Sequence, residues 1–321
     1  MKTALYTLLK LAVSAGLLYY LALQTDLEGL GAAFAATVPS LFLLAVAFFV
    51  VSNGLGACQW YLLLRAHRLP IGFRQATVFY LTGVFFNNVL LGNIGGDALR
   101  IYDVRRLTGR TSGAAAATFM DRFVGLLSTC SLALIACFAV AEVRVPGVIS
   151  VLVPVWAALI LLLAMGLSRR IGRFLEGTVS RLLPASVSRR ASSLRQSMAV
   201  YRNEGWLLLG VWAVSLGVQF SRVLVYWSAG LAAGLHAGLI YFVAFQPVAA
   251  VIAALPVSIG GLGVRENIFV ELFGSVGAPE SRAFAMSLLG YAAGVVASLL
   301  GGVAFVVRRV QRADSAAVTD S

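Results

Sequence analysis

The sequence has few charged residues. Only 12% of its 321 residues are Asp, Glu, Lys or Arg, whereas 60% are hydrophobic, and the mean hydropathy is +0.90. Soluble domains carry about 25% charged residues, so this composition excludes a soluble globular protein. Several apolar runs are longer than the roughly 18 residues that a helix needs to cross a hydrocarbon core. The composition therefore predicts an all-α integral membrane protein.

Cysteine and histidine are also scarce. Cys58, Cys130 and Cys137 lie inside apolar runs, and the two histidines, His67 and His236, are far apart in the sequence. They form neither a zinc motif nor a haem motif, and the odd number of cysteines does not fit a disulfide framework. We expect no metal site and no cofactor, and we interpret the cysteines as small core residues.

The sequence lacks the common local motifs of catalysis. It has no Gly-x-Ser-x-Gly elbow, no phosphate-binding P-loop, no dinucleotide fingerprint and no His-Glu-x-x-His motif. We therefore expect that the chain is not an enzyme. A membrane enzyme that uses Asp97, Asp121 or Glu266 on a lipid phosphate remains an alternative, although nothing beside these carboxylates resembles an activated nucleophile.

The net charge of +12 comes largely from arginines that cluster in short loops between apolar runs. This is the positive-inside pattern, so we do not expect nucleic acid as a partner. The pattern places both termini in the cytoplasm and predicts a multi-pass protein of the cytoplasmic (inner) membrane of a prokaryote. The first run could pass for a signal peptide, but no clear cleavage site follows it, and we interpret it as a membrane helix.

Six apolar runs predict full crossings of the membrane. The expected spans are residues 5–23, 41–64, 114–140, 148–167, 206–232 and 283–307. Between the fourth and fifth spans, residues 168–204 carry eight arginines against two glutamates, with apolar residues at helical spacing. This segment predicts an interfacial amphipathic helix, and a solvated connecting helix is the alternative. We expect residues 311–321 to form a disordered cytoplasmic tail.

Two further apolar stretches are interrupted. Residues 75–106 contain asparagines and glycines and have cytoplasmic charge at both ends, whereas residues 236–281 are broken by prolines and glycines between two outer ends. We interpret both as re-entrant helical hairpins, the first entering from the cytoplasmic side and the second from the outer side.

The order of these elements divides the chain into two similar halves. Residues 1–142 and 146–310 each read helix, helix, hairpin, helix. Because three crossings are an odd number, the second half is inserted upside down. The sequence predicts two inverted-topology halves, each with three transmembrane helices and one re-entrant hairpin, as in many secondary transporters.

Each hairpin contains one copy of a glycine–arginine motif. Residues 93–100 read Asn-Ile-Gly-Gly-Asp-Ala-Leu-Arg, and residues 258–265 read Ser-Ile-Gly-Gly-Leu-Gly-Val-Arg. Glycines allow a tight turn into a helix, the helix N-terminus attracts anions, and an arginine one turn further can hold a phosphate. Alternatively, the glycines only allow close packing and each arginine pairs with a nearby acid. The candidate substrate-binding residues of the two tips are Asn87, Asn93, Gly95, Gly96, Asp97 and Arg100, and Ser258, Gly260, Gly261, Arg265 and Glu266.

Three charged residues inside predicted spans complete the candidate site. Asp121 and Arg122 either face the site or reach the cytoplasmic surface. Arg222 lies deep in the fifth span and predicts a headgroup contact or a partner for Asp97 or Glu266. Asn53, Gln59 and Gln246 are weaker candidates, because hydrogen bonds between helices explain such residues equally well.

These motifs resemble a known family. Residues 85–88 (Phe-Phe-Asn-Asn) and 95–100, followed by Asp121-Arg122 and Gly125, look like the first signature of the lysylphosphatidylglycerol synthase transmembrane (flippase-like) family. Residues 255–266 look like its second signature, and the resemblance spans nearly the whole chain. It implies a lipid-translocating membrane domain.

The resemblance has two departures. In the multiple peptide resistance factor of this family, aminoacyl transfer belongs to a separate soluble domain, and little sequence follows Arg312 here, so we expect no synthetase activity. Where the family commonly has proline or serine near the first glycines, this chain has Gly92-Asn93.

The sequence thus predicts a flippase-like transporter. Its expected substrate is an anionic phospholipid or lipid-linked intermediate, similar to aminoacyl-phosphatidylglycerol or a polyprenyl phosphate, held between the two Gly-Gly-x-x-x-Arg tips. The alternative is a non-transporting accessory subunit that presents lipid to a separately encoded synthetase or glycosyltransferase. The oligomeric state stays open, and a dimer is compatible with the sequence.

Overall fold

The computed structural model describes residues 27–89, 95–139, 146–168, 196–254, 258 and 261–319. All regular structure in these ranges is helical, which confirms the all-α class. The helices are α2 (Leu27–Ala35), α3 (Pro39–Ala66), α4 (Phe73–Val89), α5 (Gly95–Thr108), α6 (Thr111–Ala139), α7 (Pro146–Leu167), the 3-10 helix η2 (Ala199–Asn203), α10 (Gly205–Ala232), α11 (Leu239–Ala253), α12 (Val264–Gly274) and α13 (Glu280–Thr319).

Four helices in the described ranges are long and apolar enough to cross a membrane. They are α3, α6, α10 and the part of α13 from Glu280 to Arg308. Their ends lie within three residues of the predicted spans 41–64, 114–140, 206–232 and 283–307. The predicted span 148–167 corresponds to α7, whose apolar part, Leu152–Ala164, is shorter and contains Pro154. The predicted span 5–23 lies outside the described residues.

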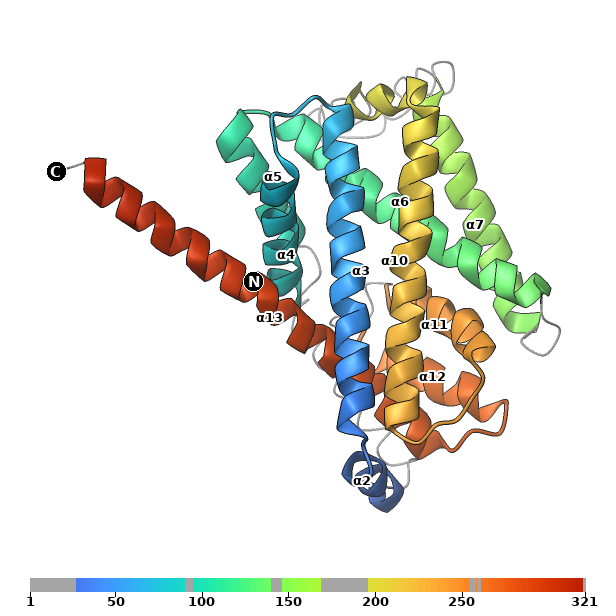
Figure 1. Ribbon diagram of the computed structural model, residues 1–321. Coiled ribbons are helices and arrows are strands. Elements are labelled where there is room, and N and C mark those ends of the chain that lie inside the picture. The colour runs from blue at the N-terminus through green and yellow to red at the C-terminus, as the bar shows by residue number, and fades with distance from the viewer. Residues whose placement is uncertain are drawn as a thin grey trace, which may run out of the picture.

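Helices α3 and α10 form an antiparallel central pair (Figure 1). At one end the Val38 amide, just before α3, donates to the Ala232 carbonyl at the end of α10, with an N···O distance of 3.2 Å. At the other end the Tyr201 hydroxyl of η2 donates to the Leu63 carbonyl near the end of α3, at 3.1 Å. These two bonds fix the relative direction of the pair.

Two short helical hairpins attach to opposite ends of this pair. Helices α4 and α5 follow the end of α3, and α11 and α12 follow the end of α10, which points the other way; Figure 1 shows them in the upper and lower halves of the molecule. These four helices have 17, 14, 15 and 11 residues. At 1.5 Å per residue they are about 16–26 Å long, too short to cross a core of about 30 Å.

Glycines allow the first hairpin to pack closely. A Cβ atom on Gly96 of α5 would lie 1.8 Å from the Gly83 carbonyl oxygen of α4. A Cβ atom on Gly301 of α13 would lie 2.0 Å from the Leu81 carbonyl oxygen on α4. Because no side chain fits at either position, α4 is held between α5 and α13 at backbone contact distance.

The packing partners of the two hairpins correspond to each other. Helix α4 packs on α13 and α11 packs on α6, while α5 packs on α6 and α12 packs on α13. The long helices follow the same rule. The contact of α3 with α6 corresponds to that of α10 with α13, and the contact of α3 with α13 corresponds to that of α10 with α6. Two inverted halves would produce this exchange, but the division stays a prediction because its first span lies outside the described residues.

A polar layer separates two apolar cores. One core surrounds the first hairpin and includes Trp60, Met120 and Tyr201, and the other surrounds the second hairpin and includes Phe242 and Phe269. Between them, several buried side chains are polar, and Ser52, Asn53, Ser215 and Gln219 lie at this level of α3 and α10. This layer holds the candidate site.

Two segments differ from the sequence-based expectations. Residues 27–35, which lie between the first two predicted spans and were assigned no element, form the short helix α2; its leucines and alanines favour a helix, and Glu28 stands in its first turn. Helix α13 continues to Thr319, so most of the predicted disordered tail, residues 311–321, is helical; residues 303–319 contain neither glycine nor proline. Of the predicted amphipathic segment, residues 169–195 lie outside the described residues.

Candidate functional site

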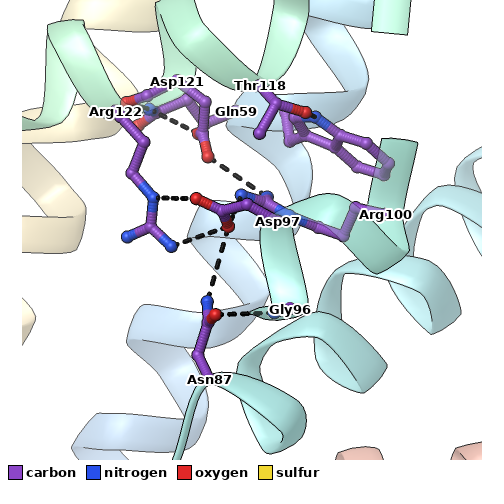
Figure 2. A network of polar contacts seen from close by, with 9 residues as sticks. Gln59, Asn87, Gly96, Asp97, Arg100, Thr118, Asp121 and Arg122 are labelled. Carbon is purple, nitrogen blue, oxygen red and sulfur yellow. Dashed lines mark hydrogen bonds and ion pairs between the residues drawn. The ribbon is translucent and has the colours of Figure 1, made fainter. Parts of the chain in front are cut away.

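Arg100 lies at the centre of a buried polar network. It stands in the second turn of α5 and is 2% exposed. Its Nη2 lies 2.7 Å from Asp97 Oδ1, and its Nη1 lies 3.2 Å from Asp121 Oδ2 (Figure 2). The guanidinium carbon is 5.1 and 4.8 Å from the ring centroids of Trp60 and Tyr80. Two carboxylates and two aromatic faces thus satisfy this cation.

Arg122 reaches the same network from α6. Its Nε and Nη2 each donate to one oxygen of Asp97 at 2.8 Å, a bidentate pair (Figure 2). Gln59 of α3 donates to Asp121 Oδ1 at 2.9 Å. Asp121 is therefore buried inside the protein rather than directed to the cytoplasmic surface, which decides between the two interpretations of this residue.

Asn87 connects α4 to the start of α5. Its side-chain oxygen accepts a hydrogen bond from the Gly96 amide at 2.8 Å, and its Nδ2 lies 3.4 Å from Asp97 Oδ1 (Figure 2). The expected anion-binding amide of the first tip is therefore occupied by a side chain of the protein.

The second tip is built in a similar way. Arg265 pairs with Glu266, and its Nε donates to Glu266 Oε1 at 3.1 Å and to Ser287 Oγ of α13 at 3.3 Å. The other oxygen of Glu266 accepts the Gly263 amide at 2.6 Å, which caps α12. Gly261 and Gly263 have φ values of 78° and 83°, which only glycine adopts without strain.

The pairing of arginines with nearby acids, weighed as the alternative for both tips, is therefore what the structure contains. The Gly96 and Gly263 amides are also occupied. A ligand at the tips would therefore bind to guanidinium groups rather than to these backbone donors.

Two adjoining cavities lie between the tips. The one that we call the arginine cavity has a volume of about 290 Å³, and its neighbour has about 300 Å³. Both are lined by Tyr80, Arg122 and Arg222. The polar side chains of the arginine cavity are Asn53, Tyr80, Asn87, Asn88, Arg100, Arg122, Arg222, Tyr226, Gln246, Arg265 and Tyr291. Those of the neighbouring cavity are Gln59, Tyr80, Asp121, Arg122, Thr129, Ser215, Gln219 and Arg222.

These cavities lie near the midpoints of the four candidate membrane spans. Their walls include Asn53 of α3, Gly125 of α6, Arg222 of α10 and Gly294 of α13. Each is close to the midpoint of a span of 28 or 29 residues, which is about 42–44 Å long. A midplane position, reached by two broken segments, is typical of the substrate site in secondary transporters.

Arg222 differs from the other three arginines of the cavity. Among the described residues no carboxylate lies within ion-pair distance of it, and its Nε is buried without a hydrogen-bond partner. The predicted pairing of Arg222 with Asp97 or Glu266 is absent, because those carboxylates pair with Arg100, Arg122 and Arg265. Arg222 is the unpaired cation in the described part of the wall.

The structure brings most of the predicted site residues together. Asn87, Arg100, Arg122, Arg222 and Arg265 line the arginine cavity, and Asp121 lines its neighbour. The others line neither of these two cavities: Gly95, Gly96, Asp97, Ser258, Gly261 and Glu266. Asn93 and Gly260 lie outside the described residues.

Three tyrosines that line the arginine cavity, Tyr80, Tyr226 and Tyr291, were not predicted from the sequence. In the sequence, Tyr226 and Tyr291 cannot be distinguished from the apolar residues of their spans. Tyr80 could have been identified, because it precedes Asn87 by seven residues. Seven residues are about two helical turns, so both side chains lie on one face of α4. This spacing was the available signal.

Comparison with known proteins agrees with this architecture. The profile of the family described as "Lysylphosphatidylglycerol synthase TM region" matches residues 7–302. A "UPF0104 membrane protein" of Methanothermobacter thermautotrophicus (strain Delta H) is 26% identical in an alignment of 270 positions, and the match covers 76% of each chain. The chain belongs to the lysylphosphatidylglycerol synthase transmembrane family and is a multi-pass membrane protein.

Proposed function

We propose that this family member is a flippase-like transporter that moves an anionic lipid between the two leaflets, with the lipid headgroup held in the arginine cavity. The observation that carries the proposal is the unpaired Arg222 at the middle of α10. A charged group near the bilayer centre costs several kcal/mol, about 3 on insertion scales, unless it faces a partner or a water-filled cavity. An anionic headgroup supplies the missing partner.

The surrounding groups support an anionic headgroup. Arg100, Arg122 and Arg265 line the same cavity. The carboxylates that pair with them do not line it, so the arginines are the charged groups that the cavity presents. Arginine holds phosphate through two parallel hydrogen bonds. A phosphate can therefore bind Arg222 directly and take further donors from neighbouring guanidinium groups.

The hairpins suggest how the headgroup gains access from both sides. The two hairpins approach the cavity from opposite ends of the α3–α10 pair. Each contributes one arginine to the cavity wall, Arg100 from the first hairpin and Arg265 from the second. Movement of one hairpin at a time would open the cavity to one leaflet and then to the other. In this proposal the protein lies in the cytoplasmic membrane of a prokaryote with both termini inside, and it moves lipid without chemical modification.

Lipid exchange in liposomes tests this proposal. The purified protein is reconstituted with fluorescent phosphatidylglycerol, and a membrane-impermeant reductant measures how fast inner-leaflet lipid becomes accessible. We expect exchange well above that of empty liposomes and at least a ten-fold loss in Arg222→Gln. Arg106→Gln, which removes an exposed arginine on α5, is the matched control and should exchange like the unmodified protein.

The same experiment separates the proposal from its main competitor. If the protein retains bound phosphatidylglycerol after purification but exchange equals that of empty liposomes, it is an accessory subunit that presents lipid to another enzyme. If Arg222→Gln exchanges lipid as fast as Arg106→Gln, the cavity is not the transport site.

A further inference from the structure

We infer that the arginine cavity selects a headgroup with one net negative charge that also carries hydroxyl groups, and that it rejects headgroups bearing a positively charged aminoacyl group. A phosphodiester that ends in glycerol or a neutral sugar has this chemistry. The inference rests on the proposed function, because it names the class of lipid that the same cavity holds.

The charge of the cavity supplies the first argument. Four arginines line it: Arg100, Arg122, Arg222 and Arg265. Three carboxylates pair with them, namely Asp97, Asp121 and Glu266. The sum is one positive charge, and residues 90–94, 255–257 and 259–260, which neighbour the two tips in the sequence, include no charged residue. A monoanion neutralises the site, whereas a cationic headgroup increases the charge imbalance.

The position of the carboxylates supplies the second argument. An ammonium group needs a carboxylate or several carbonyl oxygens when it leaves water. No carboxylate is among the described residues that line the arginine cavity, and Asp97, Asp121 and Glu266 are each paired with an arginine. A lysyl group in this cavity would face guanidinium groups of the same sign.

Two buried amide side chains supply the third argument. Asn53 is 2% exposed and Gln246 is 4% exposed, and both line the arginine cavity. Asn53 Nδ2, a donor, and Gln246 Oε1, an acceptor, have no hydrogen-bond partner among the described residues. Leaving such groups unpaired in a buried site is unfavourable.

A hydroxyl group matches this pair of amides. It accepts a hydrogen bond from Asn53 and donates one to Gln246, whereas a phosphate oxygen without a proton can only accept. A headgroup with one or more hydroxyls beside its phosphate therefore offers a partner of the right kind to Arg222 and to each of the two amides.

Competition among three lipids tests the inference. Phosphatidylglycerol is a monoanion with hydroxyls, phosphatidylmethanol is a monoanion without them, and lysyl-phosphatidylglycerol has hydroxyl and phosphate but a net positive headgroup. The full-length protein is incubated with equal amounts of the three in mixed micelles, and captured lipid is measured by mass spectrometry. We expect phosphatidylglycerol to exceed lysyl-phosphatidylglycerol at least ten-fold and phosphatidylmethanol about three- to ten-fold.

Variants assign each preference to its residues. Asn53→Leu and Gln246→Leu should each bring the ratio of phosphatidylglycerol to phosphatidylmethanol close to one while leaving discrimination against the lysyl lipid intact. Arg222→Gln should reduce discrimination against the lysyl lipid. Thermal unfolding in detergent identifies any variant that fails to fold, and the two amide variants provide independent tests of the hydroxyl contact.

The outcomes separate selectivity from transport. Capture of the lysyl lipid at the level of phosphatidylglycerol overturns the inference, and so does equal capture of phosphatidylmethanol by the unmodified protein. Selective capture without leaflet exchange supports the selectivity and overturns only the transport proposal. Exchange of all three lipids at one rate, with equal capture, overturns only the selectivity.

Discussion

At the scale of single residues, Arg100 and Arg222 show that two intramembrane arginines can have different roles. Arg100 has two carboxylate partners and two aromatic faces, so its charge is balanced before any ligand arrives. Arg222 has no carboxylate partner in the described part of the chain. Arg100 therefore holds the hairpin in place, and Arg222 is the residue left for a ligand.

The Arg100–Asp121 contact predicts a stability effect. Asp121→Asn removes one charge from a buried pair and weakens the hydrogen bond to Arg100, which retains Asp97. We expect a loss of about 1–3 kcal/mol in the free energy of unfolding, seen as a lower melting temperature in detergent. Glu271→Gln, at an exposed position of α12, should leave the melting temperature unchanged. Equal melting temperatures for both variants would show that Asp121 does not stabilise the hairpin.

Sequence reasoning recovered part of this network. Asp97 and Arg100 are three residues apart on one helix, so their pairing follows from helical spacing. The contacts of Arg122 with Asp97 and of Arg265 with Ser287 join different helices. Such contacts depend on how the helices cross, which spacing along one helix does not contain, and for that reason Arg222 could be assigned a carboxylate partner that it lacks.

At the scale of elements, the first hairpin depends on one glycine contact. Gly96→Ala would place a Cβ atom 1.8 Å from the Gly83 carbonyl oxygen, so α4 and α5 must separate and the Asn87–Gly96 hydrogen bond must lengthen. We expect a lower melting temperature and at least a ten-fold slower lipid exchange. Gly210→Ala, where nothing lies within 4 Å of the added atom, should be neutral or slightly stabilising. Wild-type behaviour of Gly96→Ala would contradict the close packing of this hairpin.

The contact between α3 and η2 predicts a dependence of stability on pH. The Tyr201 hydroxyl donates to Leu63, so His67 Nε2 donates to that hydroxyl, 3.0 Å away, and Nδ1 faces Gly113 in the first turn of α6. Burial lowers the pKa of His67 below its usual 6.5. The helix N-terminus also disfavours a positive imidazole.

The direction of the change in stability with pH follows from proton binding by His67. Below about pH 6.5 the unfolded chain takes up a proton at His67 more readily than the folded chain, so stability falls as pH decreases and is unaffected above that value. We expect the melting temperature to drop between pH 7.5 and 5.5 by more in the unmodified protein than in His67→Gln, whose amide can still donate to Tyr201. An equal drop in both proteins would exclude this residue as the cause.

Element boundaries were more predictable than element contacts. Hydropathy located four spans to within three residues, because the bilayer requires a minimum apolar length. The short helix α2 and the extension of α13 were missed, since both depend on helix propensity outside the apolar runs, where no periodic signal distinguishes helix from loop.

At the scale of the whole molecule, the antiparallel α3–α10 pair and the exchanged packing of the hairpins agree with two inverted halves. The halves differ in charge, however. The first contributes Asp97, Asp121, Arg100 and Arg122, which balance, whereas the second contributes Glu266 against Arg222 and Arg265. The unpaired charge of the cavity therefore comes from the second half.

The predicted topology can be tested by counting crossings between two loops. Arg110 lies between α5 and α6, and Val276 lies between α12 and α13. Helices α6, α7 and α10 separate them, together with the hairpin α11–α12, which returns to the side from which it entered. Three crossings are an odd number, so the two positions should face opposite sides, with Arg110 in the cytoplasm.

Cysteine labelling measures this directly. In a background in which Cys58, Cys130 and Cys137 are alanine, Val276→Cys should react with a membrane-impermeant maleimide in intact cells, and Arg110→Cys should react only after permeabilisation. Labelling of both positions from one side would contradict the opposite directions of α3 and α10, because the two hairpins follow opposite ends of this pair. A cavity reached from both leaflets through opposed hairpins would then no longer follow.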